Sequence, residues 1–151
     1  MIPFVPAGQD WTWRLAVANN GTDNAVFPSD GDTVLRDTFP NGPGYTDPGV
    51  VALDGGTSMN CTFTGDQLNC LTVGANATIN SGSTFTVNVT SNSAAVGTFN
   101  NEAADCTVDT GSQVDEGNEG NNNCDADDSV TVYDGSILIN EVDSSDGASP
   151  D

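Results

Sequence analysis

The residues whose types and spacing could support chemistry are concentrated in one acidic loop, 106–124, which reads CTVDTGSQVDEGNEGNNNC. Calcium takes six to eight oxygen ligands from carboxylates, amides and backbone carbonyls, and glycines let the chain wrap around such an ion. The candidate calcium ligands are Asp115, Glu116, Asn118, Glu119, Asn121 and Asn122. Ca²⁺ is therefore the candidate cofactor, and the alternative is a solvated acidic loop held in shape by a disulfide alone.

This loop is not an EF-hand, because the twelfth position counted from Asp115 is Ala126 rather than a glutamate. A second, weaker acidic set consists of Asp30 and Asp32 together with Asp37. The sequence therefore predicts an ion site of irregular form, if the loop holds an ion at all.

Catalytic machinery is poorly represented in this chain. Asp109-Thr110-Gly111 matches the aspartic-protease signature, but that chemistry needs two carboxylates that share a proton, and the chain has one copy. The absence of histidine excludes Ser-His-Asp and Cys-His catalysis. The basic residues are Arg14 and Arg36, too few for a phosphate-binding patch. We therefore expect a protein that is not an enzyme.

The charge is strongly negative, with 22 acidic and 2 basic residues and a net charge of −20. Such a field repels nucleic acids and anionic membrane surfaces and attracts cations. It also destabilises the compact state unless counter-ions or a bound metal offset the repulsion. We expect neither a nucleic-acid partner nor insertion into a membrane.

Four cysteines in polar, turn-rich sequence indicate two disulfides and an oxidising compartment, extracellular or at the cell surface. Of three possible pairings, Cys61–Cys70 and Cys106–Cys124 are favoured because each brackets a turn-rich segment. A zinc site is disfavoured because no Cys-x₂-Cys pair is present. The opening residues 1–6 are too short for a signal peptide, so we expect a piece of a longer secreted protein.

Composition and periodicity predict an all-β, antiparallel β-sandwich of about seven to nine short strands with two disulfides. Residues 11–17 and 83–89 alternate most clearly between apolar and polar side chains. The other predicted strands cover 25–27, 33–37, 50–53, 59–64, 67–73, 96–99, 103–108 and 130–133. The predicted organisation is an N-terminal extension over 1–10, the sandwich over 11–134, and an extra β segment with an acidic, disordered tail over 135–151.

The extra segment Ile137–Val142 is strongly β-forming. It could add an edge strand, begin a following domain, or pair with the sheet of an identical subunit. Its assembly residues would be Ile137, Leu138, Ile139 and Val142.

Aromatic residues suggest one possible role in carbohydrate binding, whereas the sequons matter only if the source organism glycosylates its proteins. Trp11 and Trp13 lie on one face of the first long predicted strand, either as core residues, which is more usual, or as a sugar-stacking platform. The latter would make the chain a carbohydrate-binding module, with Tyr45 and Tyr133 contributing. N-x-Ser/Thr sequons begin at Asn20, Asn60, Asn76 and Asn88, as also arises by chance in a chain rich in Asn and Thr.

The order of motifs resembles the conserved-repeat Ig-like domain of prokaryotic cell-surface proteins, domain of unknown function eleven, and related cell-adhesion modules. Matching elements are WRLAVANNGT, LRDTFPNG, the CTF…LNCL hairpin, NSGSTFTVNV, VGTFNNEAADC and SVTV, within residues 11–133. The resemblance implies an extracellular, non-catalytic sandwich that is repeated along large surface proteins. The two cysteine pairs and the expanded acidic loop depart from that pattern. Residues 137–142 are similar to the opening strand of lamin-tail-like domains.

These observations predict a non-enzymatic extracellular module, structural or adhesive, within a larger surface protein. The alternatives are a filament subunit that donates residues 137–142 to its neighbour, and a carbohydrate-binding module. Its partners would be neighbouring domains or identical subunits.

Overall fold

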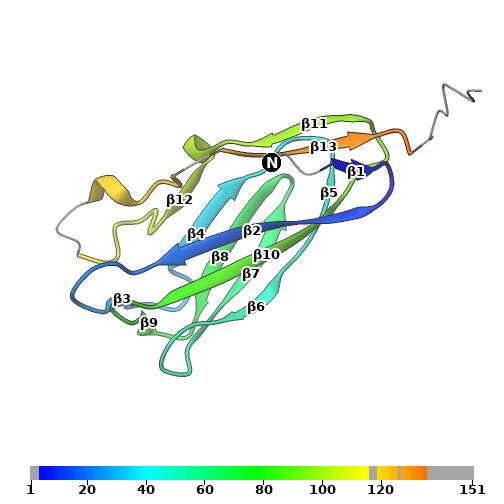
Figure 1. The fold of residues 1–151 in the computed structure, drawn as a ribbon. Helices are drawn as coiled ribbons and strands as arrows, with labels where there is room; N and C mark the ends of the chain where they lie inside the picture. Colours follow the sequence, from blue (N-terminus) through cyan, green and yellow to red (C-terminus); the bar gives the residue numbers. More distant parts are fainter. Residues whose placement is uncertain (1–3, 116–118, 126, 136–151) are drawn as a thin grey trace, which may run out of the picture.

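The computed structural model describes residues 4–115, 119–125 and 127–135, and within this part the chain is all-β (Figure 1). The strands are β1 (Phe4–Pro6), β2 (Asp10–Ala18), β3 (Ala25–Phe27), β4 (Thr33–Thr38), β5 (Gly44–Thr46), β6 (Gly49–Ala52), β7 (Ser58–Thr64), β8 (Gln67–Val73), β9 (Ala77–Ile79), β10 (Thr84–Asn92), β11 (Gly97–Asn101), β12 (Cys106–Val108) and β13 (Asp128–Tyr133). Two 3-10 turns, η1 (Ala103–Asp105) and η2 (Glu119–Asn121), complete the described elements.

One layer is built on the long antiparallel pair of β2 and β10, which stays in register from Ala18↔Thr84 to Asp10↔Asn92. β5 pairs with the other side of β10. The short pair β3–β9 prolongs the same ribbon. Between the two pairs, the Asn19 N–H donates to the Ser83 carbonyl at 2.9 Å.

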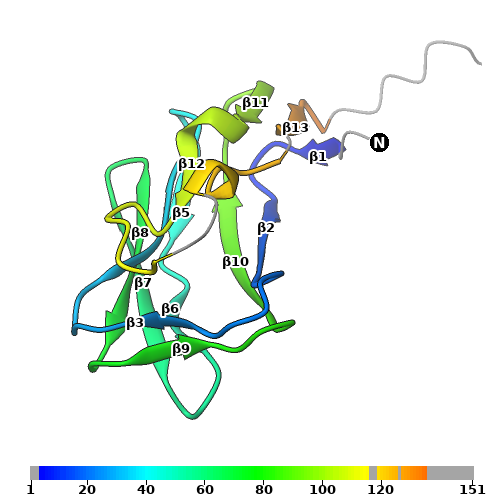
Figure 2. The same cartoon turned by 90° about the vertical axis from the view of Figure 1, so that its left-hand side faces the viewer.

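The second layer is the five-stranded sheet β12-β4-β8-β7-β6, and a separate three-stranded sheet, β1-β13-β11, lies at the top of the molecule in Figure 2. The segment Gly97–Val108 links them, because β11 pairs with β13 and, after η1, β12 pairs with β4. Figure 2 shows β6, β7 and β8 on one side of the molecule and β2 and β10 on the other. The sandwich architecture that the sequence predicts is therefore confirmed.

The core lies between the layers and follows the predicted alternation. The inward residues of β10 and β13 are all buried, namely Phe85, Val87, Val89, Val130 and Val132. An aromatic cluster fills one end, where the ring of Phe39 lies 5.9 Å from Trp13 and 5.5 Å from Phe63. Phe99 stacks on Trp11 at 6.2 Å. Burial of each such side chain stabilises the fold by about 2–3 kcal/mol before entropy is counted.

The hairpin of β7 and β8 forms as predicted, with Gly65 in its turn at φ 63°. A left-handed φ is readily adopted by glycine, which has no Cβ to clash. Cys61 and Cys70 face one another in this hairpin and are bonded. Its two strands, 58–64 and 67–73, match the predicted ranges 59–64 and 67–73 within one residue.

Three local predictions differ from the structure. Residues 4–6, which lie in none of the predicted strands, form β1 and pair in parallel with β13, with Phe4 aligned to Thr131. Residues 103–105 form η1 rather than a continuous strand, so that the chain crosses between sheets. Residues 44–46, which lie in none of the predicted strands, form β5 and pair with β10. The predicted extra β segment and tail, apart from Gly135, lie outside the described residues.

Candidate functional site

The acidic loop between Cys106 and Cys124 is closed by a disulfide and by backbone pairing. The two Cα atoms are 5.4 Å apart. The Val108 N–H donates to the Asn122 carbonyl at 2.7 Å, and the Cys124 N–H donates to the Cys106 carbonyl at 3.2 Å. The predicted disulfide pairing is confirmed at both sites.

Asp109 organises the first turn of this loop. Its φ is 44°, a left-handed conformation that Asp tolerates better than most residues. Its two carboxylate oxygens accept hydrogen bonds from the backbone N–H groups of Gln113 (2.8 Å) and Val114 (2.9 Å). The side chain is 4% exposed. The protease-like triplet is thus a turn whose carboxylate is engaged by two backbone amides.

The predicted calcium ligands are only partly covered by the structure. Asp115 and Asn121 are exposed and Asn122 is half-buried. Glu116, Asn118 and the side chain of Glu119 lie outside the described residues. Within the described part of the chain, no group of three or more His, Cys, Asp or Glu side chains is arranged to hold a metal ion. Calcium binding stays a prediction.

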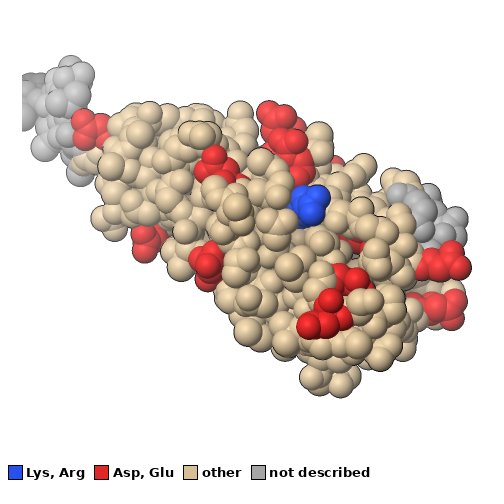
Figure 3. Space-filling view, turned by 180° about the vertical axis from the view of Figure 1, so that it is seen from behind, with Lys and Arg blue, Asp and Glu red and all other residues tan. Residues whose placement is uncertain are grey.

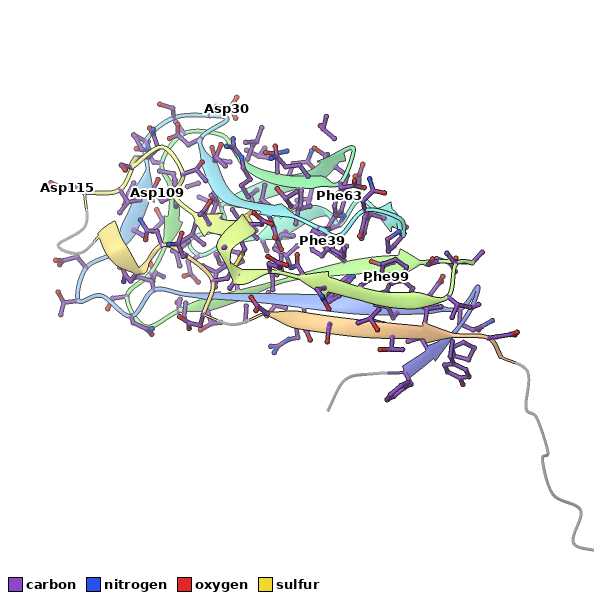
Figure 4. The ribbon with its side chains drawn as sticks, turned by 90° about the horizontal axis from the view of Figure 1, so that it is seen from above. Asp30, Phe39, Phe63, Phe99, Asp109 and Asp115 are labelled. Carbon is purple, nitrogen blue, oxygen red and sulfur yellow. A yellow bond between two sulfur atoms is a disulfide. The ribbon has the colours of Figure 1, made fainter. Side chains whose placement is uncertain are left out.

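The second acidic set does not converge on one point. Asp30 accepts a hydrogen bond from the Gly74 N–H at 2.8 Å, and Asp32 accepts one from the Ser29 N–H at 2.7 Å. Both therefore shape loops at the end of the sandwich, whereas Asp37 is fully buried. Figure 4 shows Asp30, Asp109 and Asp115 at one end of the molecule, with Phe39, Phe63 and Phe99 toward the other.

Two cavities flank the part of β2 that follows Trp13. One, of about 430 Å³, lies at the acidic end, with apolar walls from Phe27, Ile79 and Val114 and a polar rim that includes Asp115. The other, of about 410 Å³, lies between β2 and the disulfide loop. Leu15 and Val17, which point inward from β2, are only half-buried, so the sandwich is incompletely filled here.

A buried polar pair, Asp37 with Asn101, was not predicted. The Asn101 amide donates to Asp37 Oδ2 at 2.8 Å. In the described structure, Asp37 Oδ1 and Asn101 Oδ1 are buried without a hydrogen-bond partner. The sequence feature that comes nearest to indicating the burial of Asp37 is its position in a strand. In β4 it follows two apolar residues, Val34 and Leu35, which are both buried.

Burial raises the pKa of Asp37 from 3.8 to about 6, because a carboxylate loses hydration inside the core. The Asn101 hydrogen bond opposes this rise in pKa, and the charge of Asp105 adds to it. Burial likewise raises the pKa of Tyr45, whose hydroxyl donates to the Pro40 carbonyl.

The aromatic residues proposed for sugar stacking are mostly interior. Trp11 is 7% and Trp13 2% exposed, and Tyr45 stacks on Phe63 at 4.9 Å. Tyr133 is 41% exposed. The tryptophans therefore belong to the core, the more usual of the two interpretations given from sequence, and form no surface platform.

Comparison with known proteins adds no relatives. No protein-family model, curated protein or solved structure matches this chain. Among the described residues, no helix is long and apolar enough to cross a membrane. The resemblance to prokaryotic surface domains stays a prediction.

Proposed function

We propose that this chain is a non-enzymatic extracellular module, structural or adhesive, of a larger surface or secreted protein. The observation that carries the proposal is covalent closure of two segments of the chain, by disulfides that both involve strands of the five-stranded sheet. Cys61–Cys70 closes the β7–β8 hairpin, and Cys106–Cys124 closes the acidic loop. Disulfides persist in oxidising compartments and stabilise folds mainly by constraining the unfolded chain.

Polar side chains at the acidic end serve the backbone rather than a substrate. Asp30, Asp32 and Asp109 each accept hydrogen bonds from backbone amides of nearby loops. Such hydrogen bonds hold the conformations of the loops, and they engage these carboxylates with the backbone. This supports a role in which the module keeps its shape outside the cell.

The experiment is secretion of the chain with an added signal peptide, followed by unfolding and protease digestion with both disulfides intact. We expect a monomer that unfolds in one cooperative step and resists protease. Turnover of a peptide or glycoside substrate that vanishes in an Asp109→Asn variant would contradict the non-enzymatic proposal, because it would assign chemistry to the protease-like triplet.

A filament subunit is the second candidate, favoured by the two cavities beside β2. In the described part of the chain β2 pairs only with β10, and both cavities border its free side. An extended segment with alternating apolar residues, such as 137–142 of a second copy, would suit this edge.

Truncation after Gly135 separates the two candidates. For an independent module we expect an unchanged unfolding midpoint and a monomer before and after truncation. Concentration-dependent polymers that form with the full chain, and disappear after truncation or after an Ile139→Asp substitution, would instead identify the filament.

A further inference from the structure

The outer face of the five-stranded sheet carries an apolar patch, defined as Val50 on β6 with Leu71 and Val73 on β8. These side chains are 70%, 38% and 50% exposed. Figure 3 shows the molecule from this side, where acidic side chains lie in separate small groups with uncharged surface between them. Exposed apolar side chains that lie together on a sheet face usually mark a surface that something else covers.

Asn60 lies at the centre of this patch. In the sheet register it stands opposite Val50 on one side and Leu71 on the other. Side chains directly opposite in antiparallel strands have Cβ atoms about 5 Å apart. A group attached to the Asn60 amide would therefore extend over both apolar neighbours.

Asn60 also begins a complete sequon, Asn60-Cys61-Thr62. Residues two apart in a strand share a face, so the amide of Asn60 and the hydroxyl of Thr62 are presented together. Asn60 is exposed. The amide of Asn69, which stands opposite Thr62 on β8, instead donates to the Gln67 carbonyl, and its oxygen accepts from Arg36.

The other three sequons also have exposed acceptors, namely Asn20, Asn76 and Asn88. None of them lies opposite two exposed apolar side chains in the sheet register. Asn88, for example, pairs with Arg14. The apolar surroundings therefore single out Asn60.

We propose that Asn60 is an N-glycosylation site whose first sugars cover the apolar patch. The donor is an oligosaccharide linked to a lipid diphosphate. The bond from the sugar C1 to the diphosphate oxygen breaks, a bond from C1 to Asn60 Nδ2 forms, the amide loses one proton, and the lipid diphosphate leaves. Sugar rings present C–H faces to apolar side chains and hydroxyls to water, which suits a glycan lying on Val50 and Leu71.

Attachment must occur before β7 is paired on both sides, because a central strand cannot leave the sheet to enter an enzyme. The acceptor is therefore the growing chain in a secretory pathway. The inference rests on the proposed extracellular location.

The test expresses the full chain with a signal peptide in eukaryotic cells and maps peptides from both the secreted and the retained fractions. Enzymatic release of glycans in ¹⁸O-water marks each former site as labelled aspartate. We expect the label at Asn60, its complete loss in Asn60→Gln and Thr62→Ala, and its retention in Thr62→Ser. Asn80→Gln, an exposed asparagine outside any sequon, is the matched control and keeps the label at Asn60.

An unmodified Asn60 in a chain with both disulfides closed would overturn the proposal. Failure of the chain to be exported, with Asn60 labelled in the retained fraction, would instead count against the proposed function alone. The covering role has its own measurement. After glycan release we expect increased binding of a hydrophobic dye, reversed by the double substitution Val50→Ser with Leu71→Ser. No increase in dye binding would refute that role.

Discussion

Asp37 is a carboxyl group buried in a β-sandwich, and its protonation state is coupled to folding. Its pKa is 3.8 in the unfolded chain and about 6 in the fold, so the folded state binds the proton more tightly. The stabilisation of the fold that comes from this tighter proton binding is fully present below pH 4 and is lost as pH rises through about 6. A proton on Oδ1 would also turn an acceptor that lacks a hydrogen-bond partner into a donor.

We predict that Asp37→Asn raises the free energy of unfolding at pH 7 to 8, by up to about 3 kcal/mol from the pKa difference. The amide retains an acceptor for Asn101 and carries no charge to desolvate. Urea unfolding between pH 4 and 8 checks this, because the variant should lose most of the decline seen in the parent. Asp125→Asn, at an exposed position, is the control. A parent whose stability is flat across pH 4 to 7 would contradict the prediction.

Asp109 gives a second prediction at single-residue scale. Asp109→Ala removes both acceptors for the Gln113 and Val114 amides. It also places alanine, which tolerates a left-handed conformation less well than Asp, at φ 44°. We expect a loss of about 2 kcal/mol or more. Asp109→Asn keeps one acceptor and tolerates the left-handed conformation, so its loss should be smaller. Equal losses in the two variants, measured by urea unfolding, would argue against this role for the carboxylate.

At the scale of elements, part of the fold can be predicted from the sequence and part of it cannot. The alternation in β2 and β10 predicts which side chains are buried, because both strands run for nine residues with one face inward. β1 is three residues long and pairs with a strand more than a hundred residues away. A segment so short shows no periodicity, and its partner is set by tertiary packing alone.

The buried Asp37 escaped prediction for a similar reason. The pairing of β4 with β8 shifts register between Thr33 and Leu35. Val34 and Leu35 are consequently both buried, and Asp37 faces inward behind them. Sequence alternation alone does not reveal such an irregularity.

The disulfide loop provides the prediction for this scale. Replacing Cys106 and Cys124 together by Ala should lower the free energy of unfolding by about 3 kcal/mol in the chain-entropy model. Limited proteolysis should then cut between residues 109 and 122. The Cys61→Ala, Cys70→Ala pair is the control, since it should destabilise the hairpin without exposing the acidic loop. An uncut loop in the first variant would mean that backbone pairing alone closes it.

Calcium can be separated from the disulfide in the same system. If the Cys106–Cys124 disulfide holds the loop without a bound ion, the thermal midpoints of unfolding in calcium and in chelator should coincide. This should be true with the disulfide either intact or reduced. A ligand that binds only the folded state must raise the midpoint. A rise that is lost in an Asp115→Asn variant would therefore assign an ion to this loop.

At the scale of the whole molecule, charge dominates. A net charge of −20 on 151 residues destabilises the compact state by self-repulsion. We predict that sodium chloride raises the thermal midpoint at pH 7, because the screening length falls from about 10 Å at 0.1 M to about 3 Å at 1 M. Near pH 4.1, the isoelectric point, the rise should largely vanish. Equal salt responses at both pH values in calorimetry would exclude repulsion as the cause.

The parallel pairing of β1 with β13 determines how a tethered chain would carry force. Tension at the two ends would draw β1 backward along its axis and β13 forward along its own. The contacts from Phe4↔Thr131 to Pro6↔Tyr133, and the bond from the Ala7 N–H to the Tyr133 carbonyl, would then be loaded together in shear. Bonds sheared together must break at once, whereas bonds peeled from one end fail one after another. A few residues at the margin of the sandwich would thus set its mechanical strength.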